Sequence, residues 1–535
     1  MNLPLRMKLP GLAGWFGRSR PRTVVQPYAK RRRPLPWGAW LLLLFVLPLA
    51  LFAGLVTGLG STQFTMLIAG LVVAPFVLLM PATWLVGAVV FMATIGAGCL
   101  QYFARIDQAH WIPTLLLMAM LVRIPFDALS AQREGSAAPR FNALSLLLLG
   151  FVLLVLASAA MNQSKPMQIL VGFRHYIFPL ALVAAVVQAR AEPKFWLALV
   201  RGIPWLMLIQ LPICAYQYVF VEQQRGAAAF GAFGISWDAV VGSFGGNPEG
   251  GGASGALALF LSFGIGATLV LRRYGLISKR LAWTGVLAAA SSAALAEIKV
   301  LIIFLPLALL LVHRQRVLRS PVSLLAWLAG TLLMAFALLN IYHVLHYQDR
   351  AHQRDATAVD TVERMFRTEG DARFYNPFTG EVSRVGAVLL WADDNVDRNL
   401  GVRTLIGWGP AASKVSTLFG IGPAAKGKRF TLTTSAATQM LWDLGVLGLL
   451  LFGAAAAAAV WQGLAQAGRL KGASPAMAGL AEIAALGAWL VLVGLPYNGD
   501  AINNPAVQTL LALSVGWVLW LRRQQGAGGA PVRPA

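Results

Sequence analysis

The chain has few cysteines, few charges and especially few acids. Among its 535 residues are 2 cysteines and 21 acidic residues against 44 basic ones, and only 12% of all residues are charged. Cys99 and Cys214 both lie in apolar runs without the spacing of metal ligands. Buried small side chains are the expected role of these two residues, and no metal site is predicted.

Several sequence motifs are also missing. The chain has no nucleophile-elbow serine, no P-loop and no dinucleotide fingerprint, so ATP hydrolysis and redox chemistry have no support, and no cofactor is expected. A net charge of +23 would suit nucleic acid, but nothing resembles a nucleic-acid module. The acid-free segment 1–36 instead predicts a basic cytoplasmic tail held by anionic lipid. Its nine basic residues are Arg6, Lys8, Arg18, Arg20, Arg22, Lys30, Arg31, Arg32 and Arg33.

Long apolar runs dominate the rest of the chain. The hydrophobic fraction is 58% and the mean hydropathy is +0.66. Runs of about 17 to 25 residues are long enough to cross a bilayer as helices, and they lack the alternation of a transmembrane barrel strand. The sequence therefore predicts an all-α polytopic membrane protein of about 12–14 transmembrane helices. The expected spans are 37–58, 64–80, 82–100, 111–126, 142–161, 168–189, 195–221, 252–271, 281–296, 298–313, 322–345, 436–462, 476–496 and 505–521.

The charges of the connecting loops predict an orientation. Every second loop is basic, as short cytoplasmic loops usually are, which places both termini in the cytoplasm. The predicted parts are the bundle 37–346, a long outer loop 347–435, the C-terminal helices 436–521 and a cytoplasmic tail 522–535. In a bacterium this corresponds to the inner membrane, with the long loop in the periplasm.

The long loop carries much of the chain's charge. Ten of the 21 acidic residues and twelve basic ones lie between Tyr347 and Ser435. Apolar residues at helical spacing predict short amphipathic helices that form a cap on the membrane face; a structured loop that only shields the helix ends is the alternative. Asp393, Asp394 and His346 are the candidate general bases.

Two cations stand where the membrane makes charge costly. Arg174 lies in Gly172-Phe-Arg-His-Tyr176, and Lys299 lies in Ala296-Glu-Ile-Lys-Val300. An ionisable residue within a span costs at least about 2.5 to 3.5 kcal/mol, which makes it a functional candidate. Both cations suit a pyrophosphate, although Arg174 can also reach the headgroups and Glu297 can neutralise Lys299. For Glu482 a structural hydrogen bond is expected.

The order of these parts resembles the O-antigen ligase and O-antigen or exopolysaccharide polymerase family, membrane glycosyltransferases of the GT-C type. The similarity covers roughly residues 140 to 520. The segments that carry it are Gly172–Tyr176, the Asn247-Pro248 turn, Lys299, Leu405-Ile-Gly-Trp-Gly-Pro410, Phe419–Pro423 and Leu441-Trp-Asp-Leu-Gly-Val-Leu-Gly-Leu449. The chain departs from the family at Thr434 and Ser435, where a His-Asn pair is frequent, and at Lys299, where arginine is usual.

The resemblance implies transfer of a glycan from a polyprenyl pyrophosphate carrier to an acceptor hydroxyl, without a required metal. Arg174, Lys299, Arg398 and Arg403 are the implied pyrophosphate ligands. The expected partners are a polyprenyl-pyrophosphate-linked oligosaccharide, the lipid bilayer and a regulator of chain length, but no nucleic acid. Because the histidine is missing, polymerisation is favoured over ligase-type transfer to a lipid acceptor. A transporter or flippase of lipid-linked oligosaccharide is the alternative outside the enzyme class.

Overall fold

A computed structural model describes residues 75–133, 142–188, 191–223, 239–246, 248, 253–296, 298–342, 344, 382–398, 400–428 and 430–527. All of these except Pro75 belong to one compact unit, Phe76–Ala535. The tail 1–36, the span 37–58, most of the span 64–80, His346 and most of the first half of the long loop lie outside the described residues.

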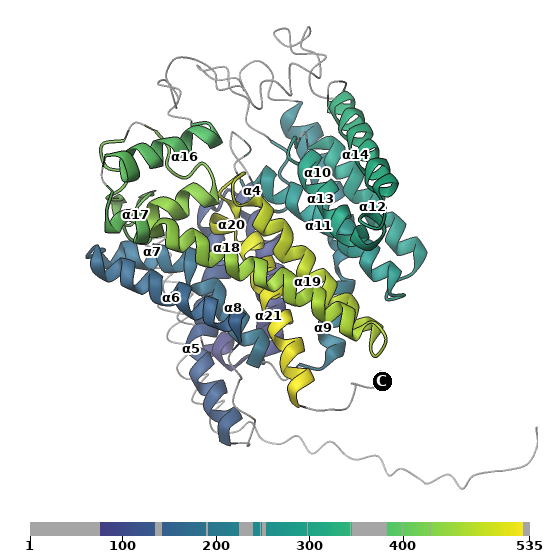
Figure 1. The fold of residues 1–535 in the computed structure, drawn as a ribbon, viewed down its shortest axis with the longest axis horizontal. Helices are drawn as coiled ribbons and strands as arrows, with labels where there is room; N and C mark the ends of the chain where they lie inside the picture. The colour runs from purple at the N-terminus through teal and green to yellow at the C-terminus, as the bar shows by residue number, and fades with distance from the viewer. Residues whose placement is uncertain are drawn as a thin grey trace, which may run out of the picture. The chain divides into compact units, whose positions relative to one another are not determined.

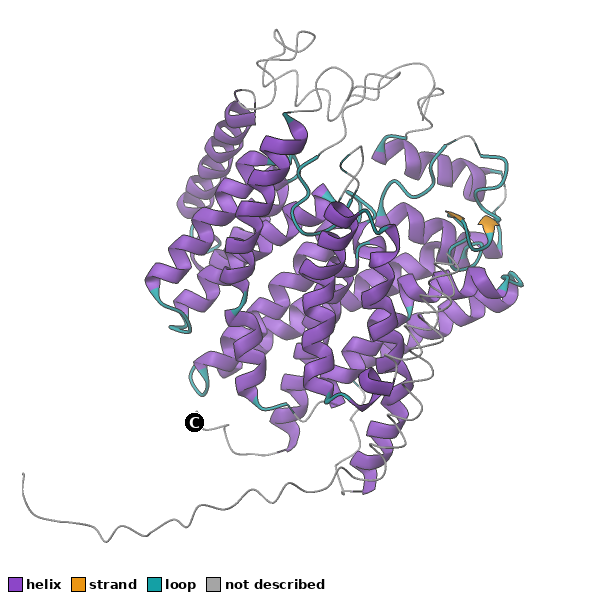
Figure 2. Cartoon of the chain, turned by 180° about the vertical axis from the view of Figure 1, so that it is seen from behind, coloured by secondary structure: helices purple, strands orange, loops and turns teal. Residues whose placement is uncertain are grey.

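The unit is built from helices (Figures 1 and 2), as predicted. In the described part, nine helical segments are long and apolar enough to cross a membrane. Six of them are the single helices Ala143–Met161 (α6), Ser254–Arg273 (α11), Pro321–Tyr342 (α14), Ala436–Leu470 (α18), Pro475–Gly494 (α19) and Pro505–Gln525, which is most of α21 (Pro505–Ala527). Ala82–Ala104 consists of α3 (Ala82–Phe91), η1 (Met92–Gly96) and α4 (Ala97–Ala104), and Asp107–Phe126 consists of η2 (Asp107–His110) and most of α5 (Trp111–Arg133). Pro193–Glu222 consists of α9 (Pro193–Arg201), α10 (Ile203–Gln217) and η3 (Tyr218–Glu222).

Three further predicted spans are also helical, but one is bent and the other two are shorter than the nine segments. The span 168–189 is two helices, α7 (Pro166–Tyr176) and α8 (Phe178–Gln188), which meet at a bend of 46°. The spans 281–296 and 298–313 appear as α12 (Lys279–Leu295) and α13 (Leu301–Val317), each 17 residues long. A multi-pass membrane protein is therefore supported.

Local sequence determines where many helices begin. Asn142, Ser278, Ser383 and Ser435 each accept a backbone N–H three residues later, at the starts of α6, α12, α16 (Arg384–Ala392) and α18. Such caps satisfy N–H groups that a helix cannot pair internally. Proline opens α7, α9 (Pro193–Arg201) and α19, where its missing N–H costs nothing.

Three helices form the centre of the unit. In the most apolar windows of α11, α19 and α21 (Pro505–Ala527), 89%, 78% and 78% of the residues are buried, whereas none are buried in that of α14. α18 packs along α19, and α8 packs along α21. The central helices are thus screened from lipid, while α14 lies at the periphery (Figure 1).

A buried ion cluster joins α11, α13 and α19. Glu482 accepts from Arg273 at 2.6 Å and from Arg314 at 2.7 Å, and its side chain is 3% exposed. The predicted structural hydrogen bond of Glu482 is therefore confirmed. One carboxylate between two guanidinium groups leaves a net positive charge at this end of the helices.

Candidate functional site

The site is organised by a break in α18. Gly445 has φ 67° and ψ −168°, a conformation that residues with a side chain rarely adopt. The break separates the first turns of α18, which carry Gln439 and Asp443, from the long remainder of the helix. Ser435 caps these first turns.

A loop fills the break and pairs with it. The backbone N–H of Trp408 donates to Trp442 O at 2.9 Å, and that of Gly409 donates to Asp443 O at 3.0 Å. The loop is led in by α17 (Val402–Ile406), and Gly407 takes nearly the same dihedral angles as Gly445, φ 75° and ψ −168°. The two glycines thus let two non-helical backbones touch.

The helix α7 lies against the same loop. A Cβ atom on Gly172 would come within 2.4 Å of Pro410 Cβ, so only glycine permits this approach. From the end of α7, Tyr176 donates a hydrogen bond to Asp443 Oδ2 at 2.7 Å. The structure therefore brings together the segments around Gly172, Gly407 and Gly445, which lie far apart in the sequence.

Asp443 is the centre of a polar network. It is fully buried, and its second carboxylate oxygen accepts the backbone N–H of Ser413 at 2.8 Å. The next residue, Lys414, donates from Nζ to Asn503 Oδ1 at 2.6 Å. Asn503, on the short helix α20 (Asp500–Asn503), in turn donates to Gln439 Oε1 at 2.9 Å. This chain of bonds holds the Lys414 ammonium at a defined place.

Two cations and an imidazole share this place. Arg174 lies over the ring of Trp111 at 4.5 Å, and the adjacent His110 is within electrostatic range of both Arg174 and Lys414. Burial lowers the pKa of Lys414 to about 8; Arg174 adds to the lowering, and Asp443 opposes it. Among the described residues, no carboxylate forms an ion pair with Arg174.

Three other predicted pyrophosphate ligands lie elsewhere. Arg398 is 66% exposed and pairs with Asp393 at 2.8 Å. Arg403 is exposed and stacks on Trp408 at 4.0 Å. Lys299 lies directly before α13, a helix that Figure 1 shows on the other side of the unit from α7.

The candidate bases of the long loop are engaged or undescribed. Asp393 and Asp394 begin η6 (Asp393–Asp397), directly after α16. Asp393 binds Arg398, and Asp394 forms an ion pair with Lys428. His346 lies outside the described residues.

The described half of the long loop is anchored to the transmembrane helices. Trp391 of α16 donates its Nε1 hydrogen to Leu441 O in α18 at 3.0 Å. Arg384 donates to Tyr497 O at 2.6 Å and covers the Tyr497 ring at 4.0 Å. Two strands of two residues each, Val415–Ser416 (β1) and Gly420–Ile421 (β2), pair antiparallel directly after Lys414. α16 therefore has a fixed position above α18.

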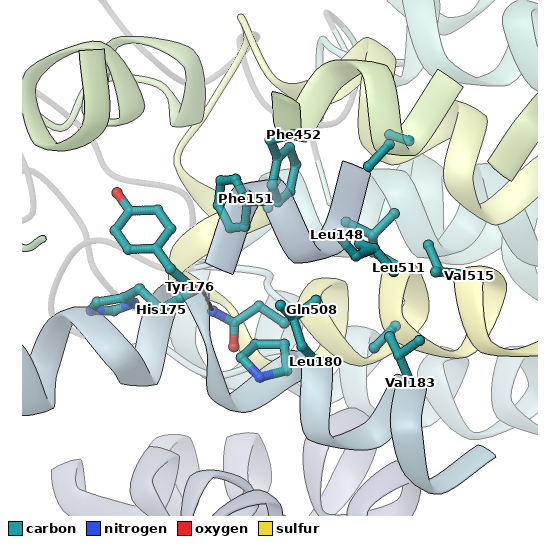
Figure 3. A pocket seen from close by; sticks show the side chains of 15 residues that line it. Leu148, Phe151, His175, Tyr176, Leu180, Val183, Phe452, Gln508, Leu511 and Val515 are labelled. Carbon is teal, nitrogen blue, oxygen red and sulfur yellow. Dashed lines mark hydrogen bonds between the residues drawn. The ribbon is translucent and has the colours of Figure 1, made fainter. Parts of the chain in front are cut away.

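A narrow apolar cavity begins at the network (Figure 3). His175 and Tyr176 line one end, and Leu511 and Val515 of α21 lie further along it. Its volume is about 40 Å³, enough for a few waters at most and too small for a lipid chain. His175 has its Nδ1 2.9 Å from Ile502 O, which makes it a structural residue.

Sequence reasoning missed Lys414 and His110. Lys414 is one of twelve basic residues in the long loop, and no local pattern distinguishes it. The position of His110 in the sequence could have marked it as a candidate site residue, because His110 ends an outer loop directly before an apolar run. Within the described residues, no three His, Cys, Asp or Glu side chains are grouped as metal ligands would be.

Comparison with known proteins adds no identification. No protein-family model matches the chain, and no curated protein matches it.

Proposed function

We propose that the protein is a glycosyltransferase of the bacterial inner membrane. It moves a glycan from a polyprenyl pyrophosphate carrier to the hydroxyl of an acceptor glycan on the periplasmic face, and so lengthens a polysaccharide. The observation that carries the proposal is the placement of Arg174 next to the Lys414 network. His175, the residue after Arg174, has its Nδ1 2.9 Å from Ile502 O, and the adjacent Asn503 holds Lys414. Among the described residues, no carboxylate forms an ion pair with Arg174. Cations withdrawn from water are costly unless a counter-charge joins them, and a pyrophosphate supplies that charge.

The two cations suit the leaving group in different ways. The planar guanidinium of Arg174 can donate two parallel hydrogen bonds to phosphate oxygens, whereas the ammonium of Lys414 acts as a point charge. As the bond from the sugar to the pyrophosphate breaks, negative charge grows on the departing oxygen. Fixed cations at that oxygen stabilise the transition state more than the ground state.

The acceptor hydroxyl must lose its proton as its oxygen bonds to the sugar. We assign this proton to water at the site, because the cations near His110 repel a further positive charge on its imidazole. The carboxylates of Asp393 and Asp394 are less suited, since each holds a cation of the loop. The products are the lengthened glycan, the free polyprenyl pyrophosphate and a proton released to water.

The test uses the full chain in lipid nanodiscs with a polyprenyl-pyrophosphate oligosaccharide. Replacing Arg174 by alanine is expected to lower glycan transfer by roughly 100-fold or more, as the loss of a charge-stabilising donor does. Replacing Arg398, an exposed arginine already paired with Asp393, is the matched control and should cost less than about tenfold. Wild-type product length in Arg174→Ala would remove Arg174 from the mechanism.

A transporter of lipid-linked oligosaccharide is the second candidate. Discontinuous helices are frequent at transporter sites, and the chain has two such features, the bend between α7 and α8 and the break at Gly445. The same nanodisc assay separates the two functions. An enzyme releases the carrier and joins glycans, whereas a transporter leaves every glycan on its carrier and, in sealed vesicles, changes only the leaflet.

A further inference from the structure

A second apolar cavity runs beside α21. Its volume is about 300 Å³, several times that of the cavity at His175. On α21 it is lined from Ala506 to Trp517, and its other walls come from α3 (Ala82–Phe91), η1 (Met92–Gly96), α9, α10 (Ile203–Gln217) and α11. It therefore lies among four membrane-spanning segments, on a different face of α21 from the first cavity.

The length of this cavity matches a lipid chain that lies along the bilayer normal. Eleven residue steps separate Ala506 from Trp517, which corresponds to about 16 Å of helix, or roughly half of a hydrocarbon core. The mouth is lateral, because its lining residues Phe91, Trp205 and Ile209 are 55%, 58% and 41% exposed. A chain can thus enter sideways from the membrane.

Two polar atoms in the lining have no partner within the described structure. They are the Thr509 hydroxyl and the Trp517 Nε1 hydrogen, and both residues line the cavity and are only 3% exposed. Buried donors of this kind usually find an acceptor. A saturated acyl chain offers none, but an isoprenoid chain has a double bond in every five-carbon unit, whose π electrons can accept a weak hydrogen bond.

One end of the cavity lies close in sequence and space to the cation site. Ala506 opens the same helix end as Asn504, and the neighbouring Asn503 holds Lys414. We infer that the cavity between α3, α10 and α21 binds the polyprenyl chain of the donor, with its pyrophosphate at Lys414 and Arg174. The inference rests on the proposed function for the identity of the headgroup, whereas the chain site itself is tested separately.

The test is photolabelling of the full chain in nanodiscs with a polyprenyl phosphate that carries a diazirine near the middle of its chain. Labelled peptides are expected in α3, α10 and α21, and unlabelled polyprenyl phosphate should compete with the probe. Gly87→Phe should reduce labelling at least fivefold, because Gly87 lines the cavity and a Cβ there meets nothing within 4 Å. Gly330→Phe in α14, equally open, is the matched control.

The outcomes separate this inference from the proposed function. Equal labelling by a saturated phosphatidylglycerol probe, or full labelling in Gly87→Phe, would overturn the chain site. Competition in the wild-type chain decides the matter even if Gly87→Phe does not fold. If the probe labels the cavity and no glycan is transferred, the site stands and the proposed function fails. If Gly87→Phe transfers glycan normally and the probe does not label the cavity of the wild-type chain, the chain site fails and the proposed function stands.

Discussion

Replacing Gly445 by alanine tests whether the break in α18 builds the site. An alanine Cβ at this position would lie 2.3 Å from Leu405 O and 2.6 Å from Ile406 N. Both neighbours are backbone atoms, so no side-chain rotation can relieve the overlap. The chain must either straighten α18 or move the end of α17, which contains Leu405 and Ile406, away from α18.

The expected cost follows from the dihedral angles and the bonds. A side chain at φ 67° and ψ −168° costs about 1–3 kcal/mol. The hydrogen bonds from Trp408 and Gly409 to α18 would lengthen, and each contributes about 0.5–1.5 kcal/mol. The free energy of unfolding should therefore fall by roughly 2–6 kcal/mol. Because the loop continues into Ser413 and Lys414, transfer should fall by roughly 100-fold.

The assay is unfolding by sodium dodecyl sulfate in mixed micelles, followed by tryptophan fluorescence, with glycan transfer measured on the folded fraction. Gly453→Ala is the matched control, because Gly453 lies on the same helix with nothing within 4 Å of a Cβ. That change should be neutral or stabilising by up to about 1 kcal/mol. If the free energy of unfolding of Gly445→Ala lies within about 0.5 kcal/mol of the wild-type value and transfer is normal, the break in α18 does not build the site.

Two further predictions concern charge. Burial lowers the pKa of Lys414 to about 8, so its ammonium is lost as the pH rises from 7 to 9. The affinity of the chain for inorganic pyrophosphate should therefore fall up to tenfold per pH unit above 8. Isothermal titration calorimetry measures this affinity. Lys414→Arg should keep its affinity at pH 9, and an equal decline in that variant would contradict the role. In the ion cluster of α11, α13 and α19, Glu482→Gln should lower the free energy of unfolding by about 3 kcal/mol in the same micelle assay. This value is at the low end of the cost of breaking a buried ion pair, because Arg273 is 42% exposed. Double replacement by Glu482→Leu and Arg314→Met should cost less than Glu482→Gln, and an equal or larger cost would show that the ion pair itself stabilises the bundle.

Hydrophobic run lengths determined the helical class and most of the spans. This information is local, because each span must satisfy its own backbone hydrogen bonds within lipid. The cost of a charge in a span also drew attention to Arg174 and Glu482, and both turn out to lie in polar clusters. Glycine at positions 172, 407 and 445 marked segments that the structure brings into contact.

Only the tertiary structure decided which charges meet. In the sequence Arg398, Arg403 and Lys414 are equivalent cations of one loop, but the fold leaves the first two exposed on the loop surface and carries Lys414 to Asn503. The difference arises because Gly407 and Gly445 allow two backbones to touch, which directs the chain after Pro410 inward. Long-range contacts of this kind have no signature in local hydropathy. The sequence could therefore predict that the chain crosses a membrane, but not that Lys414 lies near Arg174.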